Sequence, residues 1–253
     1  MRIKKRSGFP KAVLKDLVDD ICRRIHSNEG KFLLLEMIEE IPYDIRAEVM
    51  ERLSSFYSPE MVNFFELIRL EYGKEMESIC VRALDKYRMS GLEAVPAVDN
   101  EVAFYKAYGT CTRYTGRMTL DVAWKTSNQT LRVECFYLTF NSDGIHSFFV
   151  AEDMPVESYE KDRQGSADML ELSLEEASML INDAYKFNIR FMSRPALGKF
   201  LYQKYLEEKN YVSPQRMNGL LRKLTVKLTP RQLVNSLFRA LRYQDYSYIR
   251  STL

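Results

Sequence analysis

The sequence is poor in the residue types and patterns that common enzymes need. Its 253 residues include only two histidines and ten glycines. No G-x-S-x-G, H-E-x-x-H or glycine-rich phosphate loop occurs, which argues against the commonest serine hydrolases, zinc proteases and nucleotide-binding folds. No apolar run approaches the roughly 20 residues that span a bilayer, so we expect no membrane partner.

The four cysteines are scattered along the chain, and no C-x-x-C pattern is present. Free thiols in a reducing cytoplasm are therefore the simplest interpretation. His26 and His146 lie far apart and lack the Cys/His spacing of a metal site, so we expect no metal ion and no cofactor. The basic start MRIKKRSGFPK precedes a segment interrupted by Lys15, Asp16 and Asp19, which predicts an amphipathic helix and not a signal sequence.

Residues 1–95 are predicted to form a helical part. Apolar residues recur at helical spacing in 32–41, 45–56, 61–73 and 75–88. Pro42 and Gly73 each separate the two helices of a pair. Ser58 followed by Pro59 is typical of a helix start, because serine caps the first turn and proline has no N–H to leave unpaired there.

The two predicted helix pairs match when one is shifted by 31 residues, so that Leu53 falls on Leu84 and Pro42 on Gly73. A helical hairpin with one apolar face needs a neighbour, as in an α-solenoid. In IPYDIRAEVMERL and YGKEMESICVRAL the chain resembles HEAT-like repeat proteins with short repeats, over roughly residues 31–90. The resemblance implies a helical surface for a protein partner. A generic helical bundle is the alternative.

Residues 100–155 are predicted to form an antiparallel meander of about four strands, because segments rich in aromatic and β-branched residues are bounded there by turn-formers. In 131–140 one face begins with charged residues and continues with Phe136, Leu138 and Phe140. That change from polar to apolar predicts a helix over the far end of the face.

Residues 170–253 are predicted to form a basic helical part, either separate from the sheet or joined to it in one compact unit. The polar stretch at 156–168 is interpreted as a loop. Ser173 and Glu176 stand at capping-box spacing and predict a helix start. Further helices are predicted at about 195–208, 214–224 and 230–243.

The net charge of +2 is distributed unevenly. Residues 190–253 carry 13 Lys and Arg against 3 Asp and Glu, a local net of +10, and residues 1–30 carry a net of +4. The remaining residues, 31–189, therefore have a net charge of −12. The candidate binding residues for nucleic acid or an acidic partner are the basic side chains Arg222, Lys223, Lys227, Arg231, Arg239 and Arg242.

Three interpretations of this basic end stay open at the level of sequence. The basic groups can be neutralised by acidic residues of the same chain or of a second copy. They can attract phosphates, with the interleaved tyrosines stacking on bases. They can also contact an acidic protein partner.

His146 lies beside Asp143 and Gly144, and a catalytic corner would need an orienting partner and a group to activate. Asp-Gly between two strands is typical of a hairpin turn, and we interpret His146 as structural. Cys135 is expected on an apolar face, where a thiol is inert. If the chain is nevertheless an enzyme, His146, Asp121 and Glu134 are the candidates.

The sequence therefore predicts an α+β protein with N-terminal helical hairpins, a small antiparallel sheet and a C-terminal helical part. We expect a non-enzymatic interaction or adaptor protein that presents helical-repeat surfaces to a protein partner, including self-association. The alternative is a nucleic-acid-binding protein that uses its basic C-terminal helices.

Overall fold

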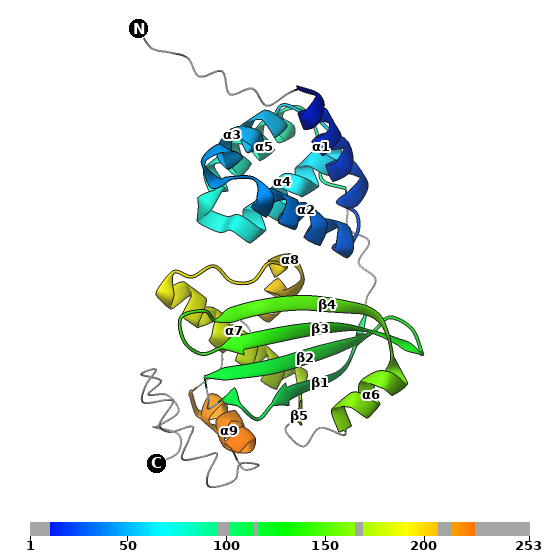
Figure 1. The fold of residues 1–253 in the computed structure, drawn as a ribbon, viewed down its shortest axis with the longest axis vertical. Coiled ribbons are helices and arrows are strands. Elements are labelled where there is room, and N and C mark those ends of the chain that lie inside the picture. The colour runs from blue at the N-terminus through cyan, green and yellow to red at the C-terminus, as the bar shows by residue number, and fades with distance from the viewer. Residues whose placement is uncertain (1–10, 96–101, 114–115, 165–168, 207–213, 226–253) are drawn as a thin grey trace. The chain divides into compact units, whose positions relative to one another are not determined.

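The computed structural model describes residues 11–95, 102–113, 116–164, 169–206 and 214–225, and the chain divides into two units, 1–99 and 100–253 (Figure 1). The first unit is helical, and the second contains an antiparallel sheet followed by helices. This is the α+β fold that the sequence predicts. No helix in the described ranges is long and apolar enough to cross a membrane.

The first unit consists of short helices separated by tight connections. They are α1 (Lys11–Arg24), α2 (Asn28–Glu40), α3 (Tyr43–Leu53), α4 (Pro59–Tyr72), the 3-10 turn η1 (Gly73–Glu75) and α5 (Glu77–Met89). The Ser58 hydroxyl accepts a hydrogen bond from the Met61 amide and Pro59 is the first helical residue, so the predicted helix start is confirmed.

The 31-residue shift predicts that α3 lies beside α5, and this pair is present. Glu51 on α3 forms an ion pair with Arg82 on α5, and these two residues are themselves 31 positions apart. Leu53 and Leu84 are both buried. These contacts place α3 beside α5, while the resemblance to HEAT-like repeats stays a prediction.

A buried arginine holds the turn between α2 and α3. The guanidinium of Arg46 donates to the carbonyl oxygens of Glu39 and Ile41 at 3.2 Å, and it lies 3.5 Å from the Glu75 carboxylate. It also lies 5.7 Å from the centre of the Tyr72 ring. Because the last carbonyls of α2 would otherwise lack partners, Arg46 satisfies the helix end and links α2 to the α4–α5 pair.

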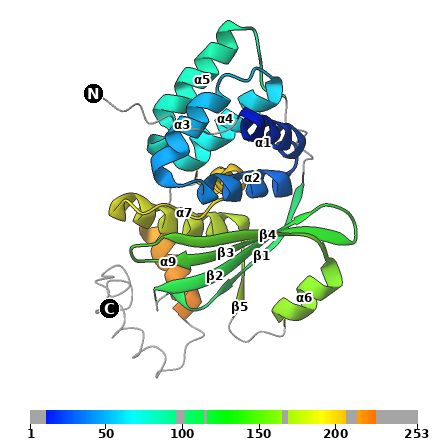
Figure 2. The ribbon, with the colours of Figure 1, turned by 45° about the horizontal axis from the view of Figure 1, so that its top comes forward.

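The second unit contains a five-stranded antiparallel sheet in the order β4-β3-β2-β1-β5 (Figures 1 and 2). Its strands are β1 (Ala103–Thr110), β2 (Arg117–Lys125), β3 (Thr130–Thr139), β4 (Ile145–Pro155) and β5 (Met169–Leu172). The predicted meander of about four strands is β1 to β4. The fifth strand was not predicted, because four residues with a charged member give too short a pattern.

Helices cover the face of the sheet that carries Phe136. The long helix α7 (Leu174–Phe191) contacts all five strands. The short helix α8 (Lys199–Tyr202) and the 3-10 turn η3 (Gln203–Tyr205) add two buried tyrosines, whose rings meet Phe136 with centroids 6.0 and 5.9 Å away. The predicted helical cover over this face is therefore confirmed.

The other face is covered at one end by α6 (Val156–Gln164), which follows β4 in both views (Figures 1 and 2). This segment was predicted as a polar loop, and that prediction is wrong. The helix buries the single ring of Tyr159, which packs on a cluster of Tyr108, Ala123, Leu131, Val133 and Cys135. Two apolar residues in nine, Val156 and Tyr159, leave too weak a periodicity to recognise a helix.

The outer strand β4 has an irregularity near its end. The pairing with β3 shifts between Leu131 and Val133, and on β4 the residues Glu152 and Asp153 lie between the paired Ala151 and Met154. Asp153 adopts a φ of 53°, in the left-handed region. This is a β-bulge that places two acidic side chains on an edge strand.

The C-terminal helices follow the predicted start signals. Ser173 and Glu176 form the predicted capping box of α7, with both hydrogen bonds present. The helix predicted at 195–208 is reduced to α8 and η3, and α9 (Pro214–Thr225) coincides with the helix predicted at 214–224. The helix predicted at 230–243 lies outside the described residues.

One buried amide joins the β3–β4 hairpin to α7. Asn188, 1% exposed, accepts from the Ile145 amide at 2.8 Å and donates to the Asp143 carbonyl oxygen at 2.5 Å. Gly144 has a φ of 60°, and a Cβ there would lie 2.1 Å from the Asn188 amide oxygen. Only glycine therefore fits the turn against this side chain.

We expect Asn188→Ala to lower the free energy of unfolding by about 2–4 kcal/mol, because it removes the partner of the buried Ile145 amide and of the Asp143 carbonyl oxygen. Trp124 is the only tryptophan and lies in β2, so urea denaturation followed by tryptophan fluorescence reports on this unit. Asn182→Ala on the same helix is the control, since the Asn182 side chain has no hydrogen bond to another described residue. Equal effects of the two substitutions would contradict the role of Asn188.

Candidate binding surfaces

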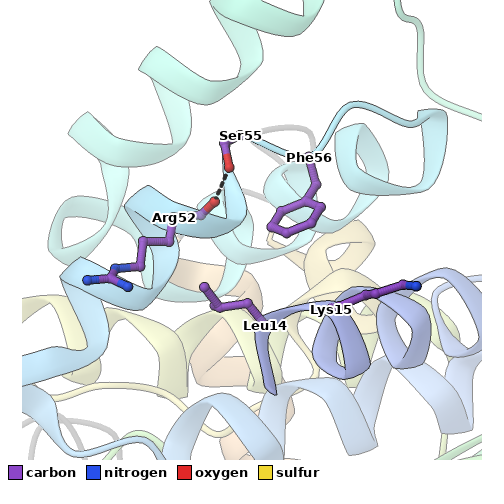
Figure 3. A pocket seen from close by; sticks show the side chains of 5 residues that line it. All are labelled: Leu14, Lys15, Arg52, Ser55 and Phe56. Atoms are coloured by element: carbon purple, nitrogen blue, oxygen red, sulfur yellow. Dashed lines mark hydrogen bonds between the residues drawn. The ribbon is translucent and has the colours of Figure 1, made fainter. Parts of the chain in front are cut away.

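A surface cavity of about 520 Å³ lies between α1 and the end of α3 (Figure 3). Leu14 and Lys15 line it from α1, and Arg52, Ser55 and Phe56 line it from α3 and the residues after it. The Ser55 hydroxyl donates to the Arg52 carbonyl oxygen at 2.7 Å, which closes the last turn of α3.

This cavity combines apolar side chains with cations. Figure 3 shows the Leu14 side chain and the Phe56 ring between Arg52 and Lys15. Arg52 is paired with Glu48 at 2.6 Å, whereas Lys15 has no ion-pair partner in the described residues. The cavity can therefore take an apolar group, with Lys15 available to a nearby carboxylate.

The candidate basic residues on α9 have different surroundings. Lys223 lies 2.8 Å from a carboxylate oxygen of Glu176, and the neighbouring basic residue Arg216 pairs with Glu175. Both carboxylates belong to the first turn of α7, where negative charge is favoured by the helix dipole. Arg222 is exposed and has no ion-pair partner among the described residues.

The ion pair with Glu176 therefore favours the interpretation that Lys223 is neutralised within the chain. Tyr202 and Tyr205, two of the tyrosines that were predicted to interleave with the basic groups, are buried against the sheet and cannot stack on bases. The other candidates, Lys227, Arg231, Arg239 and Arg242, lie outside the described residues.

The corner at His146 is a hairpin turn, as predicted. The Thr139 amide donates to the Gly144 carbonyl oxygen at 2.7 Å, which closes the turn between β3 and β4. The His146 side chain is 53% exposed and lies 3.7 Å from the Asp143 carboxylate. The register sets Cys135 opposite Phe149, so the strand pairing does not bring His146 opposite the thiol.

The two candidate acids are buried and paired on opposite faces of the sheet. Asp121 lies 2.6 Å from the Arg163 guanidinium of α6, and burial raises the pKa of Asp121 although Arg163 opposes that shift. Glu134 is fully buried and accepts hydrogen bonds from Lys204 at 2.8 Å and from the Tyr205 hydroxyl at 2.5 Å. Each acid fastens a covering helix or turn to the sheet.

The Cys135 thiol is 7% exposed, and burial together with the neighbouring Asp121 raises its pKa. A thiol with a raised pKa carries little thiolate near neutrality and is a poor nucleophile. The structure thus buries Cys135 on the face that the sequence predicts, with the apolar cluster on one side and the Asp121 carboxyl group as a neighbour.

We expect thiol-reactive reagents at pH 7.5 to modify Cys22 before the other cysteines of the native chain. Cys22 is partly exposed, whereas the remaining three are buried, and burial raises the pKa of Cys80 to about 12. Timed alkylation with iodoacetamide, followed by peptide mass spectrometry, gives the order. Urea-unfolded chain is the control, in which all four cysteines should react at similar rates. Rapid native labelling of Cys135 would contradict its burial.

A second exposed apolar surface, which the sequence did not reveal, lies at the end of α7. Ile189, Phe191 and Met192 are 63, 48 and 93% exposed. Met192 caps the helix with a φ of 53°, a left-handed conformation that glycine adopts more readily than residues with a Cβ. Sequence periodicity assigns Ile189 and Phe191 to a helix end but carries no signal for this exposure.

We expect Met192→Gly to raise the free energy of unfolding by about 1 kcal/mol, since glycine has no Cβ to strain in the left-handed region. The fluorescence of Trp124 in urea measures the effect. Lys186→Gly within α7 is the matched control and should lower stability by about 1 kcal/mol, because its position has ordinary helical geometry. A loss of stability in Met192→Gly would refute the assigned strain.

The described residues hold no group of three or more His, Cys, Asp and Glu side chains placed to bind a metal ion. Comparisons with protein-family models, curated proteins and solved structures find no match to this chain.

Proposed function

We propose that the chain is a non-enzymatic interaction protein whose helical unit binds a segment of a protein partner in the cavity between α1 and α3. The proposal rests on an apolar lining, Leu14 and Phe56, beside the ammonium group of Lys15, which has no ion-pair partner among the described residues. A segment with an apolar side chain beside a carboxylate suits both features.

The packing of the helical unit supports this function. Helices that stack in pairs leave curved surfaces for partners, since each repeat contacts only its neighbours. Buried Leu34, Leu35 and Leu53 and the satisfied Arg46 hold the helices in place. A cavity on such a scaffold is largely formed before the partner arrives, which reduces the entropy lost on binding.

The full chain can be tested against a library of displayed peptides. We expect selected peptides to share an aromatic or branched apolar residue within a few positions of Asp or Glu. Phe56→Ser should lower the affinity for the selected peptides by about tenfold, because an apolar contact is lost. Lys15→Glu should lower the affinity for these peptides by about two- to tenfold. This difference in affinity should become smaller as the salt concentration increases.

Tyr43→Ser is the matched control, because Tyr43 is an aromatic residue that is 74% exposed on α3 and does not line the cavity. It should leave the peptide affinity unchanged. Circular dichroism checks that each variant is folded. Peptides that bind wild type, Phe56→Ser and Lys15→Glu equally would refute the proposed site.

A further inference from the structure

The sheet face that carries Tyr159 and α6 is covered along only part of its length. Toward the hairpin of β3 and β4 this face continues beyond α6, and exposed residues occupy it. Its members are the exposed Arg117, Thr119, His146, Ser147 and Phe149 and the half-buried Tyr137, which we call the open face. The exposure of the other five side chains shows that no helix of the described chain lies over them.

The strand register sets which residues share this face. Tyr137 on the inner strand β3 is paired with Thr119 on β2 and with Ser147 on β4. Phe149 is paired with Cys135, whose side chain packs toward α6. Because directly paired residues point to the same side of a sheet, Tyr137 and Phe149 lie on one face as diagonal neighbours.

Folding alone gives no reason for the exposure of Phe149. Its neighbour Phe148 points to the opposite face, where its ring lies 5.1 Å from that of Tyr202. Phe149 itself is 61% exposed. On the same face the ring of Tyr137 meets the imidazole of His146 at 5.4 Å, edge to face.

The charges of the open face suit a phosphate-bearing ligand. Arg117 is exposed, and the strand segments 117–119, 135–139 and 145–149 contain no Asp or Glu, while the Asp143 carboxylate of the hairpin turn lies 3.7 Å from the His146 imidazole at the end of this face. The Asp121 carboxylate further along β2 is buried and paired with Arg163. Residues 226–253 contain five Lys and Arg and one Asp. Their net positive charge strengthens the attraction between the whole chain and an anion.

We propose that the open face binds single-stranded nucleic acid, with one base stacked on Phe149, a second on Tyr137 and a phosphate at Arg117. Aromatic rings on an open antiparallel sheet stack unpaired bases of any sequence, because every base has a π-face. The hydroxyl groups of Thr119 and Ser147 beside the rings suit the sugar and phosphate oxygens. This site is in the second unit and does not depend on the proposed function of the helical unit.

Fluorescence anisotropy of the full chain with fluorescein-labelled 12-mers of uridine and of thymidine tests the proposal at about 50 mM salt, where phosphate attraction is strong. We expect binding of both strands and weaker binding of a duplex of equal length, whose bases are stacked inside. Phe149→Ala should weaken single-strand binding by about fivefold or more, and Phe149→Trp should retain it. Arg117→Ala should reduce the slope of log affinity against log salt by about one.

Tyr43→Ala in the helical unit is the control, because Tyr43 is also an exposed aromatic residue. It is not a member of the open face, so this variant should bind as wild type does. Phe149 is exposed, so its substitution leaves the core intact, and circular dichroism verifies the fold. Three results would overturn the proposal: no binding by wild type, equal affinity for the duplex, or equal affinities of Phe149→Ala and Tyr43→Ala. The last result would assign any binding to the basic residues alone.

Discussion

The second unit depends on how the two faces of one sheet are removed from water. A strand of alternating side chains presents a different surface on each side, and both surfaces need cover or polarity. On one side α7 crosses all five strands, and α8 and η3 complete the cover. On the other side the short α6 buries one ring. The unequal lengths of these helices decide which residues stay exposed.

Buried ion pairs fasten these covering elements to the sheet. Glu134 holds η3 through Lys204 and Tyr205, while Asp121 holds α6 through Arg163. An unpaired carboxylate in either place would be strongly destabilising, so each acid specifies which element docks against it. The two acids that looked most like catalytic candidates in the sequence thus have a structural explanation.

Periodicity and capping patterns were sufficient to predict much of the fold. Ser58, Pro59, Ser173 and Glu176 mark helix starts because capping is a local interaction, readable from a few adjacent residues. The helix α6 escaped prediction because its docking depends on Tyr159 and Arg163 meeting distant partners. Contacts between residues far apart in the sequence produce no hydrophobic periodicity that could be recognised.

The candidate sites were less predictable than the fold, because exposure is a property of the assembled chain. The charge count identified Lys223 as basic, but its partner Glu176 lies 47 residues earlier in the sequence. Phe149 and Phe148 are adjacent and chemically identical, yet one is exposed and the other is buried. Only the strand register distinguishes them.

The bulge in β4 has a consequence for the behaviour of the protein at high concentration. An outer strand of eleven residues can offer backbone groups to another extended chain, which is a route to aggregation, although the Ile145 carbonyl oxygen at its start already accepts from the Ala196 amide. The left-handed Asp153 interrupts the regular backbone there, and Glu152 beside it adds a second negative charge. Two copies that approached edge to edge would meet both a distorted strand and like charges. The irregularity thus disfavours self-pairing along the outer edge of β4.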